Sequence, residues 1–238
     1  MLACSGALLV YHVDRAINIP EEDFENAPKR IAWYKSHRFY LWVSGATALG
    51  LVGVAATFLP FHLLVLGASL GVLGIIYGIF IPGTSFRIKD IPIAKTLLII
   101  FCWIFGSVLL PLKGEIETAF LLVLAGYKGL AILPNILVAN WMDREGDKKH
   151  GVLSSRVWLG WNGVRYVTLG CFVVSLAVVL QVSQYNNMLW LGLVDLAGLA
   201  AMSVLIWRSS KNNLPDIVYF DLLVGFSLVT WLLWLAVY

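Results

Sequence analysis

Long apolar runs separated by short polar stretches dominate the chain. A helix that crosses the ~30 Å hydrocarbon core of a bilayer needs about 20 predominantly apolar residues. The pattern therefore predicts an all-α, multi-pass transmembrane helical bundle with seven full spans, at 39–60, 61–82, 96–112, 118–139, 162–182, 187–207 and 217–238. An apolar segment at 1–13 precedes them, and we expect a partial span there because thirteen helical residues rise only ~20 Å.

The distribution of lysine and arginine over the connecting stretches supports this span count. Stretches 14–38, 83–95, 140–161 and 208–216 carry five, three, four and two basic residues, whereas the intervening turns carry only Lys113. Short cytoplasmic loops hold an excess of Lys and Arg, and an error of one span would destroy the alternation. The pattern predicts that the four basic stretches are cytoplasmic.

Composition agrees with a membrane protein. Apolar residues make up 60% of the chain, charged residues 13%, and the mean hydropathy is +0.83. Soluble domains have about 45–50% apolar and about 25% charged residues. The net charge of +3 is too small to indicate a nucleic-acid partner. We expect an integral protein of the cell (inner) membrane, in contact with the lipid bilayer.

The stretch 140–151 carries the densest group of polar side chains and follows an apolar run directly. Asn140, Asp143 and Asp147 are spaced by three and four residues, so on a helix end they share one face. Oxygen ligands in this arrangement suit Mg²⁺, which takes one or two carboxylates together with substrate phosphates. Arg144 and Lys148 can meet further phosphate charge. The alternative is a solvated polar loop.

A second stretch, at 11–18, matches the first. Asp14 and Asp143 are each followed by arginine, and an oxygen-bearing side chain stands four residues on, Asn18 in one case and Asp147 in the other. Four predicted spans lie between the two stretches, which places both on the same membrane face. Two such sites facing one another would be able to hold two metal ions around a diphosphate.

With these motifs the chain resembles the UbiA superfamily of intramembrane prenyltransferases, whose two aspartate-rich motifs read close to N-D-x-x-D-x-x-x-D. Asn140, Asp143 and Asp147 resemble the second motif, and Asp14 resembles the central aspartate of the first. The stretch 77–103 is similar to the family's loop after the fourth span. The resemblance covers essentially the whole chain, 1–238, as a single domain. It implies the nine-helix fold without its first helix, as in an N-terminally truncated member.

The resemblance implies transfer of an isoprenoid group from a polyprenyl diphosphate to an aromatic or lipid-like acceptor, with Mg²⁺ as cofactor. Asp14, Asp143 and Asp147 would be catalytic, and Asn18 and Asn140 would join them around the metal. Four cationic side chains would bind the diphosphate: Arg87, Lys89, Arg144 and Lys148.

The first motif departs from the family pattern. Val10-Tyr11 replaces its leading Asn-Asp pair, and Asn18 replaces its last aspartate. His12 is a poor substitute because imidazole is a weak Mg²⁺ ligand. The acidic run 21–23 either compensates or is simply solvated. A catalytically inactive or fragmentary isoprenoid-binding relative is therefore the alternative function.

Charges inside the apolar runs indicate functional positions by default, because they are costly at mid-bilayer. Lys128 and Asp195 lie deep in their predicted spans, whereas Arg165 and Asp221 lie near span ends. The deep residues either pair with each other or line a cavity that takes substrate. They also leave open a third reading, a small-molecule transporter.

Overall fold

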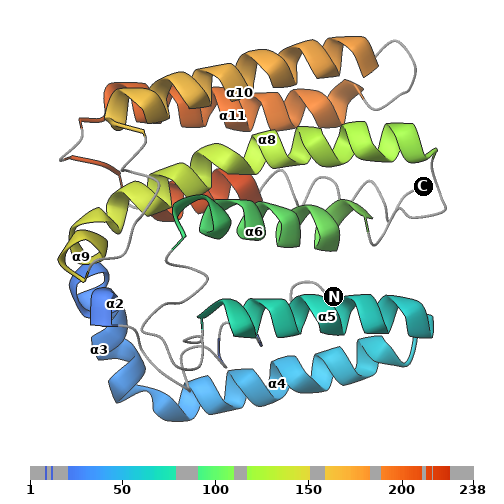
Figure 1. Cartoon of the computed structure of the whole chain (residues 1–238), viewed down its shortest axis with the longest axis vertical. Helices are drawn as coiled ribbons and strands as arrows, with labels where there is room; N and C mark the ends of the chain where they lie inside the picture. Colours follow the sequence, from blue (N-terminus) through green and yellow to red (C-terminus); the bar gives the residue numbers. More distant parts are fainter. Residues whose placement is uncertain are drawn as a thin grey trace. The chain divides into compact units, whose positions relative to one another are not determined.

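The structure, a computed structural model, describes residues 9, 12, 21–78, 91–109, 117–150, 159–182, 189–210, 213–215 and 217–225. The regular elements of these residues are helices, apart from an isolated bridge between Ser210 and Asn213. Residues 217–225 are helical as well. The other helices of the described residues are α2 (Glu21–Asn26), α3 (Pro28–Ser36), α4 (Arg38–Ala56), α5 (Phe61–Gly78), α6 (Pro92–Ile104), the π-helix η2 (Phe105–Leu109), α8 (Thr118–Met142), α9 (Arg144–Lys149), α10 (Trp161–Val182) and α11 (Leu189–Arg208). All of them except η2 are labelled in Figure 1.

Three of these helices are long and apolar enough to cross a membrane: α4, α8 and the Trp161–Gln181 part of α10. With 19, 25 and 21 residues they rise about 28, 37 and 31 Å, which matches the bilayer core. They suggest an integral membrane protein and agree with three of the predicted spans. Shorter apolar helices, Phe61–Gly74 and Lys95–Leu109, overlap two further predicted spans.

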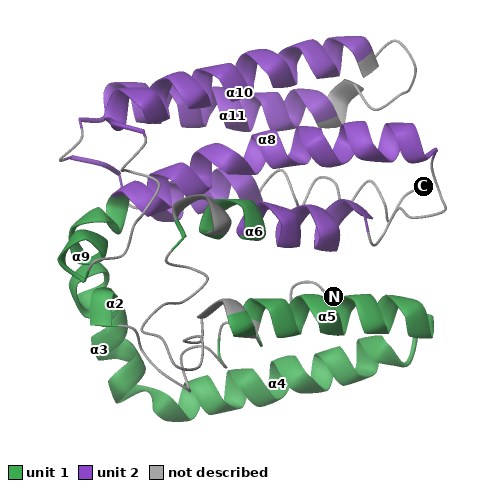
Figure 2. Cartoon of the chain, in the orientation of Figure 1, with its two compact units in different colours: residues 1–98, 142–154 green, residues 99–141, 155–238 purple. Residues whose placement is uncertain are grey.

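The chain divides into two compact units, coloured separately in Figure 2. Unit 1 comprises residues 1–98 and 142–154, and unit 2 comprises residues 99–141 and 155–238.

Unit 1 contains α2 to α5 and the short helix α9. Pro28 begins α3, at the helix position that tolerates the missing N–H of proline. Only His37 separates α3 from α4, whose aromatic side chains Phe39 and Trp42 are exposed as expected of a lipid-facing surface. The predicted connecting stretches 14–38 and 140–161 contain short helices, with α2 and α3 within 21–36 and α9 at 144–149.

Unit 2 is built around α8, in which 61% of the apolar window is buried, against 11% for α4. Two groups of buried side chains surround this helix. One includes Leu121, Leu124 and Val179, and the other includes Val138 and Ile206. Lys128 falls between the α8 members of these two groups along the sequence.

In unit 2, α10 and α11 lie side by side and antiparallel (Figure 1). Hydrogen bonds join the two helices near the C-terminal end of α11. The Arg165 guanidinium donates Nη2 hydrogen bonds to the carbonyl oxygens of Trp207 (3.1 Å) and Ser209 (2.7 Å). The Trp161 indole also donates to Ser209 O, at 3.3 Å. The last carbonyl groups of a helix have no partner within it, so Arg165 caps α11 from the neighbouring helix. This gives Arg165 a structural role.

Candidate functional site

The second motif lies where α8 gives way to α9. α8 ends at Met142, Asp143 adopts φ −75° and ψ −3°, and α9 begins at Arg144. The backbone N–H of Asp147 donates to the carbonyl oxygen of Asp143 at 3.1 Å, which is the i to i+4 bond of an α-helix. The helical turn therefore continues through Asp143, and the two aspartates follow the one-face spacing that the sequence predicts.

The carboxylate of Asp147 is buried, with only 3% of the residue exposed. Its Oδ1 accepts a hydrogen bond from Asn26 Nδ2 at 3.2 Å, whereas its Oδ2 is buried with no hydrogen-bond partner among the described residues. Burial raises the pKa of the Asp147 carboxyl to about 6. The charges of Asp143 and Glu22 act in the same direction, and Lys95 and the Asn26 hydrogen bond oppose them.

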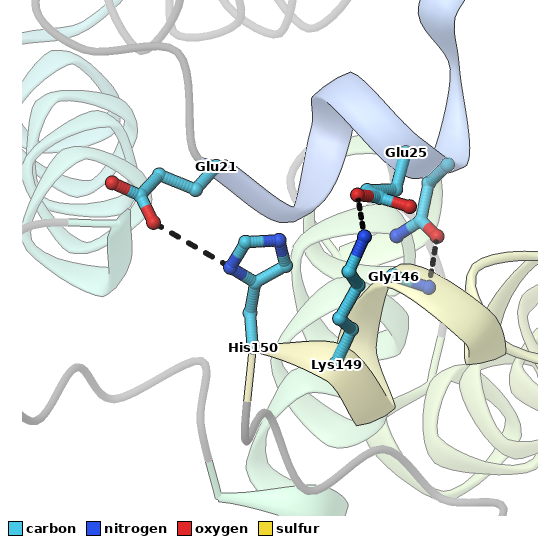
Figure 3. Close-up of polar contacts among 6 residues, drawn as sticks. Glu21, Glu25, Gly146, Lys149 and His150 are labelled. Carbon is cyan, nitrogen blue, oxygen red and sulfur yellow. Dashed lines mark hydrogen bonds and ion pairs between the residues drawn. The ribbon is translucent and has the colours of Figure 1, made fainter.

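The short helix α2 holds α9 through a row of polar contacts within unit 1. Asn26 Oδ1 accepts the backbone N–H of Gly146 at 2.9 Å, the Lys149 ammonium pairs with Glu25, and His150 Nδ1 lies 3.5 Å from Glu21 Oε2. Figure 3 shows these contacts joining the two helices side by side. The hydrogen bond and charge of Lys149 lower the pKa of the exposed Glu25.

Glycine at 146 permits this close packing. A Cβ built there would lie 2.6 Å from the backbone oxygen of Glu22 and would also collide with the Asn26 side chain. Glu22 itself is buried. The expectation of a simply solvated acidic run is therefore wrong for Glu22, although Glu21 is exposed.

A lysine to which the sequence assigned no site role contributes a positive charge near the two aspartates. Lys95 Nζ, from the start of α6, lies 3.8 Å from Asp143 Oδ2. Arg144 Nε is 2.9 Å from Glu145 Oε1, and Lys148 is exposed. Asn140 is buried on α8, one turn before Asp143, and belongs to unit 2.

The fit of this site to a metal ion rests on one atom. Among the described residues, no three His, Cys, Asp or Glu side chains come together as a metal-binding group. Mg²⁺ nevertheless takes as few as one or two carboxylates when phosphate oxygens and water complete its shell. A divalent cation can satisfy a buried carboxylate oxygen that has no donor among the described residues. The Lys95 ammonium offsets part of the negative charge of Asp143 and Glu22 around it. The donor set therefore fits Mg²⁺.

Four predicted site residues, Asp14, Asn18, Arg87 and Lys89, lie outside the described residues. The matching first motif and the predicted diphosphate loop therefore remain predictions. His12 is described, and its Nε2 lies 2.5 Å from Ser44 Oγ of α4. This contact gives His12 a structural partner in unit 1.

The two deep charges of unit 2 pair with each other. Lys128 Nζ on α8 lies 2.6 Å from Asp195 Oδ2 on α11, and their side chains are 4% and 0% exposed. Pairing is one of the two alternatives that the sequence left open. Both residues also line a small pocket whose other walls are apolar side chains of α8, α11 and residues 217–225. Near a span end, Asn135 Nδ2 donates to Asp221 Oδ1 at 3.1 Å.

Sequence reasoning missed Asn26 and gave no site role to Lys95. Asn26 lies 121 residues from the carboxylate that it contacts, and no local spacing signals such a pair. Lys95 belongs to the stretch that resembles the family's basic loop, which was the only available signal. Comparison of the chain with models of protein families, with curated proteins and with solved structures finds no match.

Proposed function

We propose that this protein transfers an isoprenoid group from a polyprenyl diphosphate to an aromatic or lipid-like acceptor within the membrane, with Mg²⁺ at the α8–α9 junction. The observation that carries the proposal is the buried Oδ2 of Asp147, which has no donor among the described residues. The identity of the transferred group rests on the resemblance of the two motifs to the UbiA-type enzymes.

The charges at the junction explain why a metal-bound diphosphate suits it. Asp143 and Asp147 supply carboxylate oxygens within one helical turn, and burial disfavours the charged form of Asp147. Bound Mg²⁺ would neutralise the diphosphate and stabilise it as a leaving group. Arg144 and Lys148 stand one residue beyond each aspartate and can donate to the remaining phosphate oxygens. Arg87, Lys89, Asp14 and Asn18 are proposed to complete the site from the predicted cytoplasmic side.

The proposed reaction balances without a redox partner. The bond between the allylic carbon and the diphosphate oxygen breaks, and its electron pair leaves with the diphosphate. An electron-rich carbon of the acceptor forms the new carbon–carbon bond, and the proton of that carbon passes to water. The apolar surfaces of the membrane-length helices would accommodate the isoprenoid tail, with seven spans and the motif loops in the cytoplasm of a cell (inner) membrane.

The pairing of Lys128 with Asp195 bears on the transporter alternative. Each charge neutralises the other at 2.6 Å, so the two residues need no transported substrate to account for them. We therefore do not adopt that function.

The test compares Asp147→Asn with Glu145→Gln in the full chain, reconstituted in nanodiscs. Glu145 is an exposed acidic side chain on the same short helix, so its variant controls for a change of charge. Labelled farnesyl or geranylgeranyl diphosphate is added with Mg²⁺ or EDTA, and diphosphate release and transfer to a panel of aromatic acceptors are measured. We expect Mg²⁺-dependent release in the native chain and in Glu145→Gln, and at least a hundredfold loss in Asp147→Asn.

Two other outcomes change the conclusion. Mg²⁺-dependent binding of the diphosphate without release would identify an inactive, isoprenoid-binding relative. Equal release by the native chain and Asp147→Asn would show that the buried carboxylate takes no part, and would refute the proposal.

A further inference from the structure

The two oxygens of the Asp147 carboxylate have different surroundings. Oδ1 receives the amide N–H of Asn26 at 3.2 Å, and Oδ2 is the buried atom without a donor among the described residues. A carboxylate that is bound through one oxygen cannot rotate freely about its last side-chain bond. The other oxygen is therefore held in one direction.

The orientation of the Asn26 amide follows from its second contact. The backbone N–H of Gly146 is a donor only, so the Asn26 atom that lies 2.9 Å from it must be the carbonyl oxygen. The amide nitrogen of Asn26 then lies toward Asp147 and donates a hydrogen bond to its carboxylate, which can only accept. Both hydrogen bonds fail if the amide is flipped, so the contacts to two successive residues of α9 fix its orientation.

We propose that Asn26 is a positioning residue for the metal site, which orients Asp147 so that its Oδ2 is presented to Mg²⁺. Asn26 does not itself bind the ion. The inference rests on the proposed function, because it assigns Asn26 to the same metal. Hydrogen bonds from outer residues commonly orient metal-binding carboxylates, and their loss typically weakens metal affinity by 10–100-fold.

The alternative role for Asn26 is to fasten α2 to α9 and nothing more. The ion pair between Glu25 and Lys149 offers a matched control because it joins the same two helices from the neighbouring position of α2 and does not touch Asp147. Glu25→Gln loosens the helix contact alone. Asn26→Leu, of similar size, removes both polar contacts of the amide.

The experiment measures the binding of Mn²⁺ to the full chain in nanodiscs with inorganic diphosphate present. Mn²⁺ replaces Mg²⁺ as the probe. Free Mn²⁺ is followed by electron paramagnetic resonance, and the helix content of each variant is checked by circular dichroism. We expect Asn26→Leu to raise the Mn²⁺ dissociation constant about tenfold or more, and Glu25→Gln to leave it within twofold. In an Asp147→Asn background, Asn26→Leu should cause no further loss, because it acts through that carboxylate.

Each outcome is decisive. If folded Asn26→Leu binds Mn²⁺ as tightly as the native chain, the positioning role is refuted and the proposed function is unaffected. If Mn²⁺ affinity falls as expected but the native chain releases no diphosphate, Asn26 positions a metal site and the prenyltransferase proposal fails. If the native chain binds no Mn²⁺, both are overturned.

Discussion

Replacing Lys128 by methionine tests how much the buried ion pair contributes to stability. Methionine keeps the length of the side chain but removes the charge that lies 2.6 Å from Asp195, whose side chain is fully buried. Removing one partner of a buried ion pair typically costs about 3–5 kcal/mol, because the remaining charge has lost its counter-ion. We therefore expect Lys128→Met to lower the free energy of unfolding by about 3–5 kcal/mol.

A second variant removes both members of the ion pair. Replacing Asp195 by leucine as well removes the remaining charge, and apolar replacements of buried ion pairs are often neutral or stabilising. The double variant should therefore unfold within about 1 kcal/mol of the native chain.

Reversible unfolding in mixed micelles, at increasing fractions of a denaturing detergent, gives these free energies at pH 7. Tryptophan fluorescence and circular dichroism follow the transition. Hydrogen bonds inside membranes average about 0.6 kcal/mol in double-mutant cycles. A loss below about 1 kcal/mol in Lys128→Met, or a double variant as unstable as the single one, would refute the reasoning.

Three further predictions concern the α8–α9 junction and the end of α11. Gly146→Ala should release α2 from α9, because its Cβ would lie 2.6 Å from the backbone oxygen of Glu22. We expect faster amide hydrogen exchange in residues 21–26 and 144–149. The control Gly50→Ala, whose Cβ would have nothing within 4 Å, should leave exchange in these residues unchanged. In EDTA, the contribution of Asp147 to stability is greatest below pH 4, because its pKa is raised to about 6, and about 3 kcal/mol of it is lost as the pH rises through about 6. Asp147→Asn should abolish this loss and unfold later than the native chain at pH 7; a steeper decline in the variant would contradict the argument. Arg165→Gln should lower stability by about 1–2 kcal/mol in the same micelle assay, since the Trp207 carbonyl loses the Arg165 hydrogen bond and the Ser209 carbonyl keeps only the one from Trp161, and an unchanged transition would show that the cap contributes nothing.

The apolar pattern predicted the long helices well, because a helix that faces lipid must be apolar over most of its length. Predicted spans 39–60, 118–139 and 162–182 correspond to α4, α8 and α10, with ends that differ by a few residues. The total of seven spans remains a prediction. The hydrophobic pattern does not predict the short helices α2, α3 and α9, because they are polar and lie outside the apolar runs.

The candidate site was predictable only where it is local. The spacing of Asp143 and Asp147 places them within one helical turn, as the backbone bond between them shows. Burial of Asp147 and its contact with Asn26 depend on where α2 lies, which no spacing encodes. For Lys128 and Asp195, the cost of charge in apolar surroundings identified both residues as candidates, but only the structure gives the distance between them.

The separation of Lys128 and Asp195 along the chain also has a consequence for biosynthesis. Asp195 follows Lys128 by 67 residues, so at 5–20 residues per second it is synthesised about 3–13 s later. During this interval α8 has left the ribosome with a charge whose counter-ion does not yet exist, and a lysine at a span centre disfavours insertion by about 2.5–3.5 kcal/mol. We therefore expect insertion of α8 to become more favourable once α11 has been synthesised.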